Sequence, residues 1–310
     1  MKIGKLLISW DRGGLDSKIL ESVDLEYEKG LQAGKKLILC TLAARSGTRL
    51  LGDIFNLHTN ATGITERYFE PECFYRYIKY NKLPIDTAGI IKLIKHGIVE
   101  DWKKGDIALV ISPFFSHGIV ELNTLLRPER IIFAINDPKF TVQSIYNKGF
   151  FEHKYVRDNV DMALGFQPNF PQKWYWLYLF GRLVPNGEFY REWDGLTRVG
   201  KIAWWGNKMN KDIWEQLKEI PKEKIFIFKL NEARQDYYGY YKNVAKEFGL
   251  TPILSEKEIK KMQKKGIKPW HNKEKIWDEK EVEEFKKYSA EWSMLYNELL
   301  SKKTFTAELV

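Results

Sequence analysis

The feature that most constrains this chain is the alternation of short aliphatic runs with helical patterns. Four runs rich in β-branched and aliphatic residues are typical of strands, and amphipathic segments with a helical period lie between and after them. The expected strands cover residues 36–41, 107–111, 130–135 and 224–230, and the expected helices cover 48–57, 85–99, 141–146, 211–219, 236–248 and 279–300.

Strands that alternate with helices form βαβ units and a largely parallel sheet. We therefore expect an α/β fold of three layers, with a central, mostly parallel sheet flanked by helices. No repeat, low-complexity tract or Pro/Gly-rich linker divides the sequence, so residues 1–310 are expected to form a single domain. Ligands of such sheets bind beyond the carboxyl ends of the strands.

Composition excludes several classes of protein. With only two cysteines, of which Cys40 lies in an apolar run, a disulfide framework is not expected and a reducing compartment fits. The N-terminal apolar patch is broken by Asp11 and Arg12 and is too short for a signal segment or a membrane span. We expect a soluble, cytoplasmic protein with no membrane partner.

The net charge of +9 indicates attraction to anions without saying which ones. The densest group of lysines, at 256–280, is mixed with glutamates, so a solvated helical face is an alternative to a nucleic-acid surface there. A basic balance also suits a pocket for nucleotide phosphates. Nucleic acid is therefore the less favoured partner.

Residues 43–47 join the first expected strand to the first expected helix. Backbone N–H groups and the helix dipole converge at such a junction, which suits a phosphate or sulfate group. Gly47 tolerates unusual dihedrals, Arg45 adds a full positive charge, and Ser46 and Thr48 add hydroxyl donors. The ATP-binding pattern G-x-x-x-x-G-K-[ST] would need a second glycine and a lysine, which are absent at that spacing. An anion loop of some other kind remains the alternative.

A strand followed by x-R-S-G-T-x-L-L and a helix resembles the bacterial-type sulfotransferases that use 3′-phosphoadenosine-5′-phosphosulfate (PAPS). In that family this loop holds the 5′-phosphosulfate of the donor, and adenosine 3′,5′-bisphosphate (PAP) is the product. The resemblance implies a P-loop-like fold and no metal. It also implies that the donor is held by Arg45, Ser46, Gly47, Thr48 and Arg49.

Residues 127–149 resemble the second nucleotide motif of the family, with Pro138 as the turn proline and Ser144 as the hydroxyl that holds the 3′-phosphate. Where the family usually places an arginine as a second phosphate ligand, this chain has Asn136. Weak donor affinity is one reading of this departure, and an ordinary βα unit that begins at a proline turn is an alternative for the whole segment. The cations that can replace the missing charge are Arg127, Arg130 and Lys139.

Two later stretches are compatible with the family. Residues 224–252 resemble its late strand and following helix, a pattern of low specificity. Residues 264–285 resemble a basic segment that closes over the 3′-phosphate, with Lys264, Lys265 and Gly266 as the matching residues. An exposed lysine-rich loop without a ligand is the alternative for this segment.

Sulfuryl transfer needs positive charge at the reacting group and a base whose pKa is raised by burial. Arg45 supplies the charge, and Glu66 is the first choice as base because many bacterial members carry a glutamate at this point. His117 is the second choice, by similarity to cytosolic small-molecule sulfotransferases. As an alternative, Glu66 is a surface carboxylate paired with Arg67 or Arg49. The alternative for His117 is a helix-terminal or core histidine.

The remaining expectations concern the acceptor. Residues 150–205 form an aromatic-rich insertion whose rings either line an acceptor pocket, stack on adenine or pack in the core. The five histidines show no zinc-ligand spacing, so no metal is expected. The rings that we single out are Trp174, Tyr175, Trp176, Tyr178, Phe180, Trp204 and Trp205.

The sequence therefore predicts a PAPS-dependent sulfotransferase that modifies a hydroxyl or amine of a small molecule, either a natural product or a sugar. A kinase-like phosphotransferase and a non-catalytic protein that binds nucleotides or nucleic acid are the alternatives. The identity of the acceptor and the oligomeric state, a homodimer included, are left open.

Overall fold

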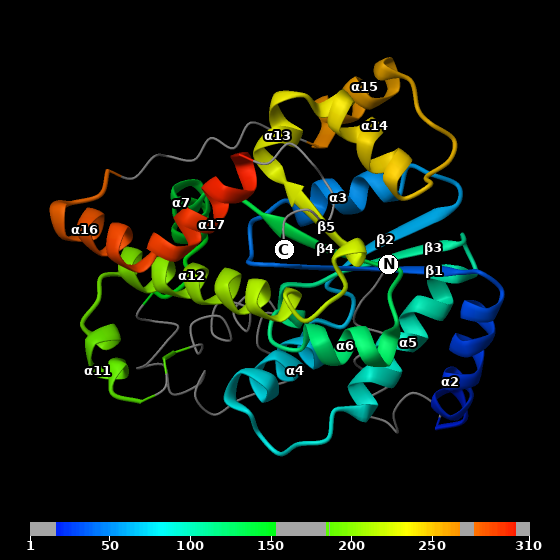
Figure 1. The fold of residues 1–310 in the computed structure, drawn as a ribbon, viewed down its shortest axis with the longest axis horizontal. Helices are drawn as coiled ribbons and strands as arrows, with labels where there is room; N and C mark the ends of the chain where they lie inside the picture. The colour runs from blue at the N-terminus through cyan, green and yellow to red at the C-terminus, as the bar shows by residue number, and fades with distance from the viewer. Residues whose placement is uncertain (1–16, 153–183, 186, 267–275, 302–310) are drawn as a thin grey trace.

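A computed structural model describes residues 17–152, 184–185, 187–266 and 276–301, with the backbone alone for 17–20 and 262–266. Its centre is a sheet of five parallel strands in the order β2-β3-β1-β4-β5 (Figure 1). The expected α/β fold with a central parallel sheet is confirmed. The strands are β1 (Lys36–Leu42), β2 (Ala61–Thr65), β3 (Ile107–Ile111), β4 (Arg130–Ile135) and β5 (Ile225–Lys229).

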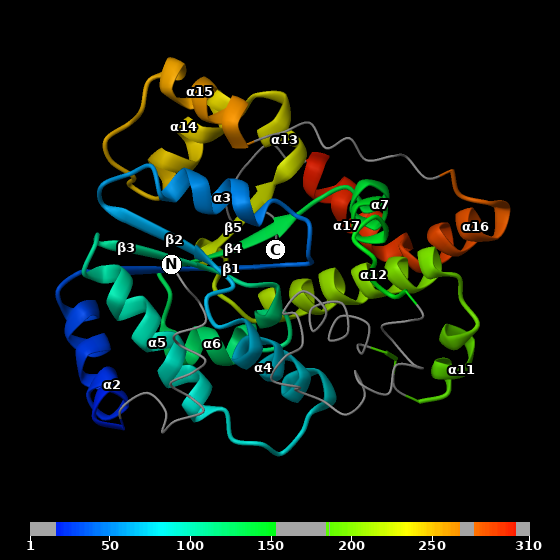
Figure 2. The same cartoon turned by 180° about the vertical axis from the view of Figure 1, so that it is seen from behind.

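Helices cover both faces of the sheet. Figure 1 shows α3, α13, α14 and α15 on one face and α4, α5, α6 and α12 on the other, and Figure 2 shows the same layers from behind. The helices are α2 (Ser17–Gln32), α3 (Thr48–Phe55), α4 (Phe69–Asn81), α5 (Ala88–Trp102), α6 (Ile119–Leu126), α7 (Pro138–Tyr146), α11 (Phe189–Asp194), α12 (Arg198–Leu217), α13 (Leu230–Gln235), α14 (Tyr237–Glu247), α15 (Glu256–Gly266), α16 (Glu279–Tyr288) and α17 (Ala290–Ser301), with short 3-10 turns at Pro113–Phe115 and Lys222–Lys224.

Two hydrophobic cores follow from the alternation of side chains along the strands. On β1, Leu37 and Leu39 belong to the core shared with α5 and α12, whereas Ile38 and Cys40 belong to the core shared with α3 and α14. All four side chains are at most 2% exposed. A strand that is buried on both faces is what a parallel sheet between helices requires.

The strand β2 was not predicted. Its sequence, ATGIT, includes the β-branched residues Thr62, Ile64 and Thr65, but the segment is short, has one large aliphatic residue and is interrupted by a central glycine. The glycine has a packing reason. A Cβ on Gly63 would lie 2.9 Å from the carbonyl oxygen of Gly52 in α3, so the helix can approach β2 this closely only because residue 63 is a glycine.

Side-chain hydrogen bonds fix α3 on this edge strand. Asn56 Nδ2 donates to the carbonyl of Gly63 at 2.7 Å, and the N–H of Gly63 donates to Asn56 Oδ1 at 2.8 Å. We call this pair of bonds the Asn56–Gly63 clamp. It ties the helix that follows the 43–47 loop to the strand that precedes Glu66.

Two expected helices differ from those observed. The expected helix 279–300 is two helices, α16 and α17, separated at Ser289, whose Oγ donates to the carbonyl of Phe285 at 2.7 Å. A serine that bonds to the preceding turn competes with the helical backbone. The expected helix 211–219 corresponds only to the last third of α12, which ends at Leu217. The helix begins directly after Thr197, whose side chain accepts from the N–H of Gly200.

The aromatic insertion lies mostly outside the described residues, because these exclude 153–183. The single-domain organisation accordingly stays a prediction. Within the part of the chain that the structure describes, no helix has the length and apolarity needed to cross a membrane.

Candidate active site

The 43–47 loop follows the central strand β1 and turns sharply into α3. Arg45 has a φ of 71° and Gly47 a φ of 100°, so two residues of the loop adopt the left-handed conformation. An arginine in this region is uncommon and carries a backbone cost, which indicates that the surrounding structure imposes it. Alternation of left-handed residues with others turns consecutive N–H groups toward one side and makes a concave anion site.

Three consecutive amides at the start of α3, those of Ser46, Gly47 and Thr48, have no described acceptor. Gly47 is the N-cap of α3 and no side chain caps the helix. Within the described ranges, no backbone or side-chain oxygen accepts from the N–H groups of Ser46, Gly47 or Thr48. The start of α7 differs, since Asp137 Oδ1 there accepts from the N–H of Phe140 at 2.8 Å. Of these two helix starts, that of α3 is the one that suits an external anion.

Buried polar atoms also gather at this loop. Among the described residues, Thr41 Oγ1, Ser46 Oγ and Asn136 Oδ1 are buried without a hydrogen-bond partner. Thr41 lies in β1 just before the loop, and Asn136 directly follows β4. Buried polar atoms are normally satisfied, so this concentration fits a site that a polar ligand completes.

The loop contacts the second sequence motif. Arg45 Nε donates a hydrogen bond to Ser144 Oγ at 2.9 Å, and Ser144 is 1% exposed. Asn136 Nδ2 donates to the carbonyl of Arg45 at 3.2 Å and to Thr141 Oγ1 at 3.0 Å. Asn136 is fully buried, and its side-chain amide supports the loop through the bond to the Arg45 carbonyl.

The three cations proposed to replace the missing arginine have different surroundings in the structure. Arg127 pairs with Glu28 of α2, and Arg130 pairs with Glu247 at 2.6 Å. Lys139 is an exposed residue at the start of α7. Neither arginine therefore faces the loop.

Other cations do lie around the loop. Burial, Arg49 and Arg234 lower the pKa of Arg45, and Glu66 opposes them. Burial, Arg45 and Arg49 lower the pKa of Lys148. We call Arg45, Arg49, Lys148 and Arg234 the cationic rim. They come from the 43–47 loop, α3, the turn after α7, and α13.

Glu66 is the first residue after β2, at the carboxyl edge of the sheet. Its φ is 50°, and its N–H donates to the carbonyl of Ile111 at 2.9 Å. Burial and the charge of Glu72 raise the pKa of Glu66 to about 8, against the opposing charges of Arg45 and Arg76. Arg67, the neighbour proposed as an alternative partner, instead pairs with Asp101.

A second buried carboxyl lies beside Glu66. Glu72 of α4 is 1% exposed, and burial raises its pKa to about 7. Its Oε2 accepts from Ser112 Oγ at 2.7 Å and its Oε1 accepts from the N–H of Tyr68 at 3.1 Å. Two neighbouring carboxyls disfavour each other's ionisation, so Glu72 helps to keep the pKa of Glu66 near neutrality.

Arg76 lies one turn after Glu72 on α4 and is 2% exposed. Its guanidinium carbon lies 4.8 Å from the ring centre of Phe114. Burial lowers its pKa to about 10, and its charge lowers the pKa of both Glu66 and His117. The two candidate bases therefore share one electrostatic environment.

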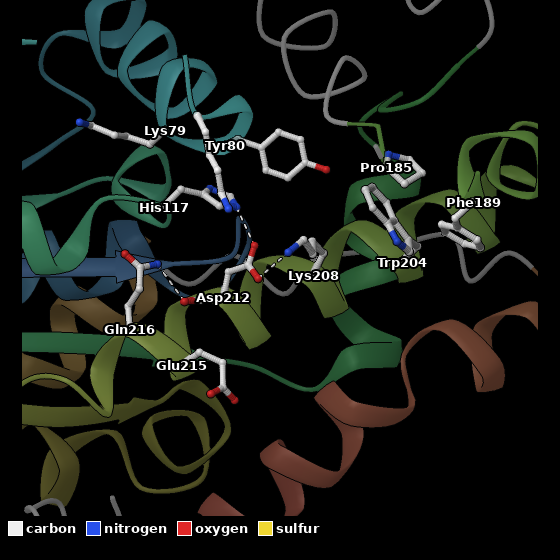
Figure 3. Close-up of a pocket in the computed structure, with 11 residues that line it drawn as sticks. Lys79, Tyr80, His117, Pro185, Phe189, Trp204, Lys208, Asp212, Glu215 and Gln216 are labelled. Atoms are coloured by element: carbon white, nitrogen blue, oxygen red, sulfur yellow. Dashed lines mark hydrogen bonds and ion pairs between the residues drawn. The ribbon is translucent and has the colours of Figure 1, made fainter. Parts of the chain in front are cut away.

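His117 lines a cavity of about 560 Å³ between α4 and α12 (Figure 3). Its Nε2 lies 3.0 Å from Asp212 Oδ2 and its Nδ1 lies 3.0 Å from Ser116 Oγ, so both ring nitrogens are engaged. Asp212 also pairs with Lys208 at 2.6 Å. Burial lowers the pKa of His117, although Asp212 opposes this.

The aromatic walls of this cavity come from several elements. Tyr80, Phe189 and Trp204 line it, together with Pro185 (Figure 3). Trp204 is one of the rings that the sequence singled out, whereas its neighbour Trp205 is 1% exposed and belongs to the core. The other rings, Trp174, Tyr175, Trp176, Tyr178 and Phe180, lie outside the described residues.

The C-terminal basic segment cannot be placed at the loop. Lys264, Lys265 and Gly266 are the last residues of α15, and only their backbone is described. Their side chains and residues 267–275 lie outside the described part of the chain. Among the described residues, no group of three or more histidine, cysteine, aspartate or glutamate side chains is arranged to hold a metal ion.

Sequence reasoning missed several residues of this site: Glu72, Arg76, Ser112, Lys148, Asp212 and Arg234. For two of them the sequence held a usable pattern: Glu72 and Arg76 are four positions apart, which places them on one face of a helix. The pattern was not used because residues 69–81 were not predicted to be helical. Lys148 and Arg234 reach the loop through the tertiary fold, and no local pattern marks them.

No family model and no curated protein matches this sequence. Among the solved structures, the crystal structure of the sulfotransferase STF9 from Mycobacterium avium is similar to this chain, with a TM-score of 0.51 and 12% sequence identity. The alignment covers 88% of this chain and 80% of that chain. At this identity the likeness shows the fold alone, which is sulfotransferase-like.

Proposed function

We propose that the chain is a sulfotransferase that moves a sulfuryl group from PAPS to a hydroxyl or amine of a small molecule such as a natural product or a sugar. One observation carries the proposal. The left-handed, amide-rich turn at the uncapped start of α3 presents Arg45 beside a carboxyl, Glu66, whose pKa is raised to about 8. The sulfotransferase-like fold supports it.

The residues have complementary roles in this reaction. The amides of Ser46, Gly47 and Thr48 hold the phosphosulfate, and Arg45 stabilises the charge that develops on the sulfuryl oxygens and the leaving phosphate. The acceptor oxygen or nitrogen attacks sulfur in line from about 3.5 Å. A new bond to sulfur forms as the bond from sulfur to the phosphate oxygen breaks, and Glu66 takes the acceptor proton.

Glu66 is preferred to His117 as the base because His117 is held at both nitrogens by Ser116 and Asp212. The cavity beside His117 is the proposed acceptor site, since its aromatic walls and charged groups can hold a ring that bears a hydroxyl or amine. Arg76 connects the two regions electrostatically.

Transfer of a radiolabelled sulfuryl group tests the proposal. The full chain is incubated with PAPS carrying sulfur-35 and a panel of phenols, amines and sugars, and labelled product and PAP are measured together. We expect both to form in equal amounts, and PAP to raise the melting temperature without magnesium while ATP does not. No transfer and no stabilisation by PAP would reject it. Tight binding of single-stranded DNA with a steep salt dependence would favour the nucleic-acid alternative.

A further inference from the structure

Asn136 leaves the donor's second phosphate without its usual cation, and its side-chain Nδ2 is engaged within the protein. It is fully buried and bonded to the carbonyl of Arg45 and to Thr141. Arg127 and Arg130 are paired with Glu28 and Glu247. If the proposed function holds, the charge that meets this phosphate has to come from a different place in the fold.

The hydroxyl of Ser144 identifies the region of the fold from which this charge can come. It accepts from Arg45 Nε at 2.9 Å, so α7 and the loop meet there. Lys148 follows four positions after Ser144, in the turn directly after α7, where its N–H donates to the carbonyl of Ile145 at 3.0 Å and where the charges of Arg45 and Arg49 act on it. Lys148 is exposed, so a ligand can reach it from solvent, whereas Ser144 is buried and bonded to Arg45.

The helix α13 also borders the region around Ser144. The guanidinium carbon of Arg234 lies 4.2 Å from the ring centre of Phe140 in α7, which brings α13 against the same helix. Arg49 is an exposed residue in the first turn of α3. Three exposed cations therefore surround the partly buried Arg45, and a bound anion reduces their mutual repulsion.

We propose that Lys148, supported by Arg49, supplies the charge for the 3′-phosphate of the donor and so distinguishes PAPS from nucleotides that carry only a 5′-phosphate group. This inference rests on the proposed function and adds to it the residue that determines donor specificity. Lys148 acts here as a binding residue, because its ammonium contacts the phosphate that does not react.

The test compares two nucleotides that differ only in the 3′-phosphate. Dissociation constants of PAP and AMP are measured by calorimetry at one salt concentration for the wild type, Lys148→Met and Lys148→Arg. The control is Lys139→Met, which removes an exposed lysine from the start of the same helix. All of these positions are exposed, so the fold is expected to tolerate the changes.

We expect the wild type to prefer PAP, and Lys148→Met to lower this preference about tenfold, the scale of one charge-assisted contact. The dissociation constant of AMP should change less than twofold, Lys148→Arg should restore the preference, and Lys139→Met should leave it intact. An unchanged preference in Lys148→Met, or a loss in Lys139→Met, overturns the inference while the proposed function stands. A wild type that binds neither nucleotide overturns both.

Discussion

Arg45 Nε and Ser144 Oγ are 99 residues apart in the sequence and 2.9 Å apart in the structure. The bond joins the loop after β1 to the helix after β4, two neighbouring strands of the sheet. It ties the Arg45 guanidinium to α7. Because the strands are parallel, the uncapped α3 terminus and Glu66 lie at the same carboxyl edge of the sheet. The predictions below depend on this arrangement.

Removal of the Arg45 guanidinium should impair chemistry more than folding. Arg45→Ala is expected to lower the turnover of sulfuryl transfer at least about a hundredfold, which is typical for loss of a charged transition-state donor. Steady-state rates with saturating PAPS provide the measurement. Arg130→Ala is the control, since that arginine pairs with Glu247 at 2.6 Å. A turnover near that of the wild type would remove Arg45 from the mechanism.

Glu66→Gln should abolish most of the activity while PAP still binds. In the wild type, kcat/KM for the acceptor is expected to rise with pH through about 8, because the raised pKa of Glu66 leaves the carboxyl protonated at lower pH. Glu70→Gln in the first turn of α4 is the matched control. If Glu66→Gln keeps its activity and His117→Ala loses it, His117 is the base.

The same substitution should stabilise the protein in a pH-dependent way. Because the folded-state pKa of Glu66, about 8, exceeds the usual value of 4.5, the carboxyl lowers stability progressively as pH rises between these two values. Glutamine carries no such charge. Melting temperatures of the wild type and Glu66→Gln should be close near pH 4.5 and should diverge up to about pH 8, with the variant higher. A constant difference across this range would contradict the shift.

Asn136 should behave as a support for the loop. Asn136→Ala removes the donor to the carbonyl of Arg45 and is expected to lower the free energy of unfolding by about 1–3 kcal/mol and to weaken PAP binding. Urea unfolding and calorimetry measure the two effects. An Asn136→Arg variant that folds normally and binds PAP more tightly would show that this position faces the ligand after all.

Gly47 should not tolerate a side chain. At its φ of 100°, a Cβ would lie 2.8 Å from Leu230 Cδ1, so Gly47→Ala is expected to cost about 1–3 kcal/mol and to weaken PAP binding. Gly89→Ala in α5 is the control, because no atom lies within 4 Å of a Cβ there. An alanine helps an exposed helix, so this control should be neutral or slightly stabilising. Equal effects of both substitutions would contradict the strained turn.

Much of the fold could be predicted from local pattern. The core strands β1, β3 and β4 are near-continuous aliphatic runs because both of their faces are covered, and the loop after β1 follows from the change of period at residue 43. The strand β2 could not be predicted, because Gly63 is there for close packing and not for strand propensity. The break at Ser289 was hidden because the amphipathic period continues across it.

The candidate site was predictable only where a motif is contiguous. Arg45, Ser46 and Gly47 lie within one short loop, and their convergence follows from a single strand and helix. Lys148 and Arg234 approach it from two other elements, and Glu72 reaches Ser112 across 40 residues. Such contacts depend on how the helices pack, which the sequence pattern alone does not specify.

The Asn56–Gly63 clamp and the close approach that Gly63 allows hold α3 directly against β2. We expect this contact to set the separation between the proposed base, at the far end of β2, and the amides at the head of α3. A substitution at Asn56 would disturb reaction rate without touching either substrate.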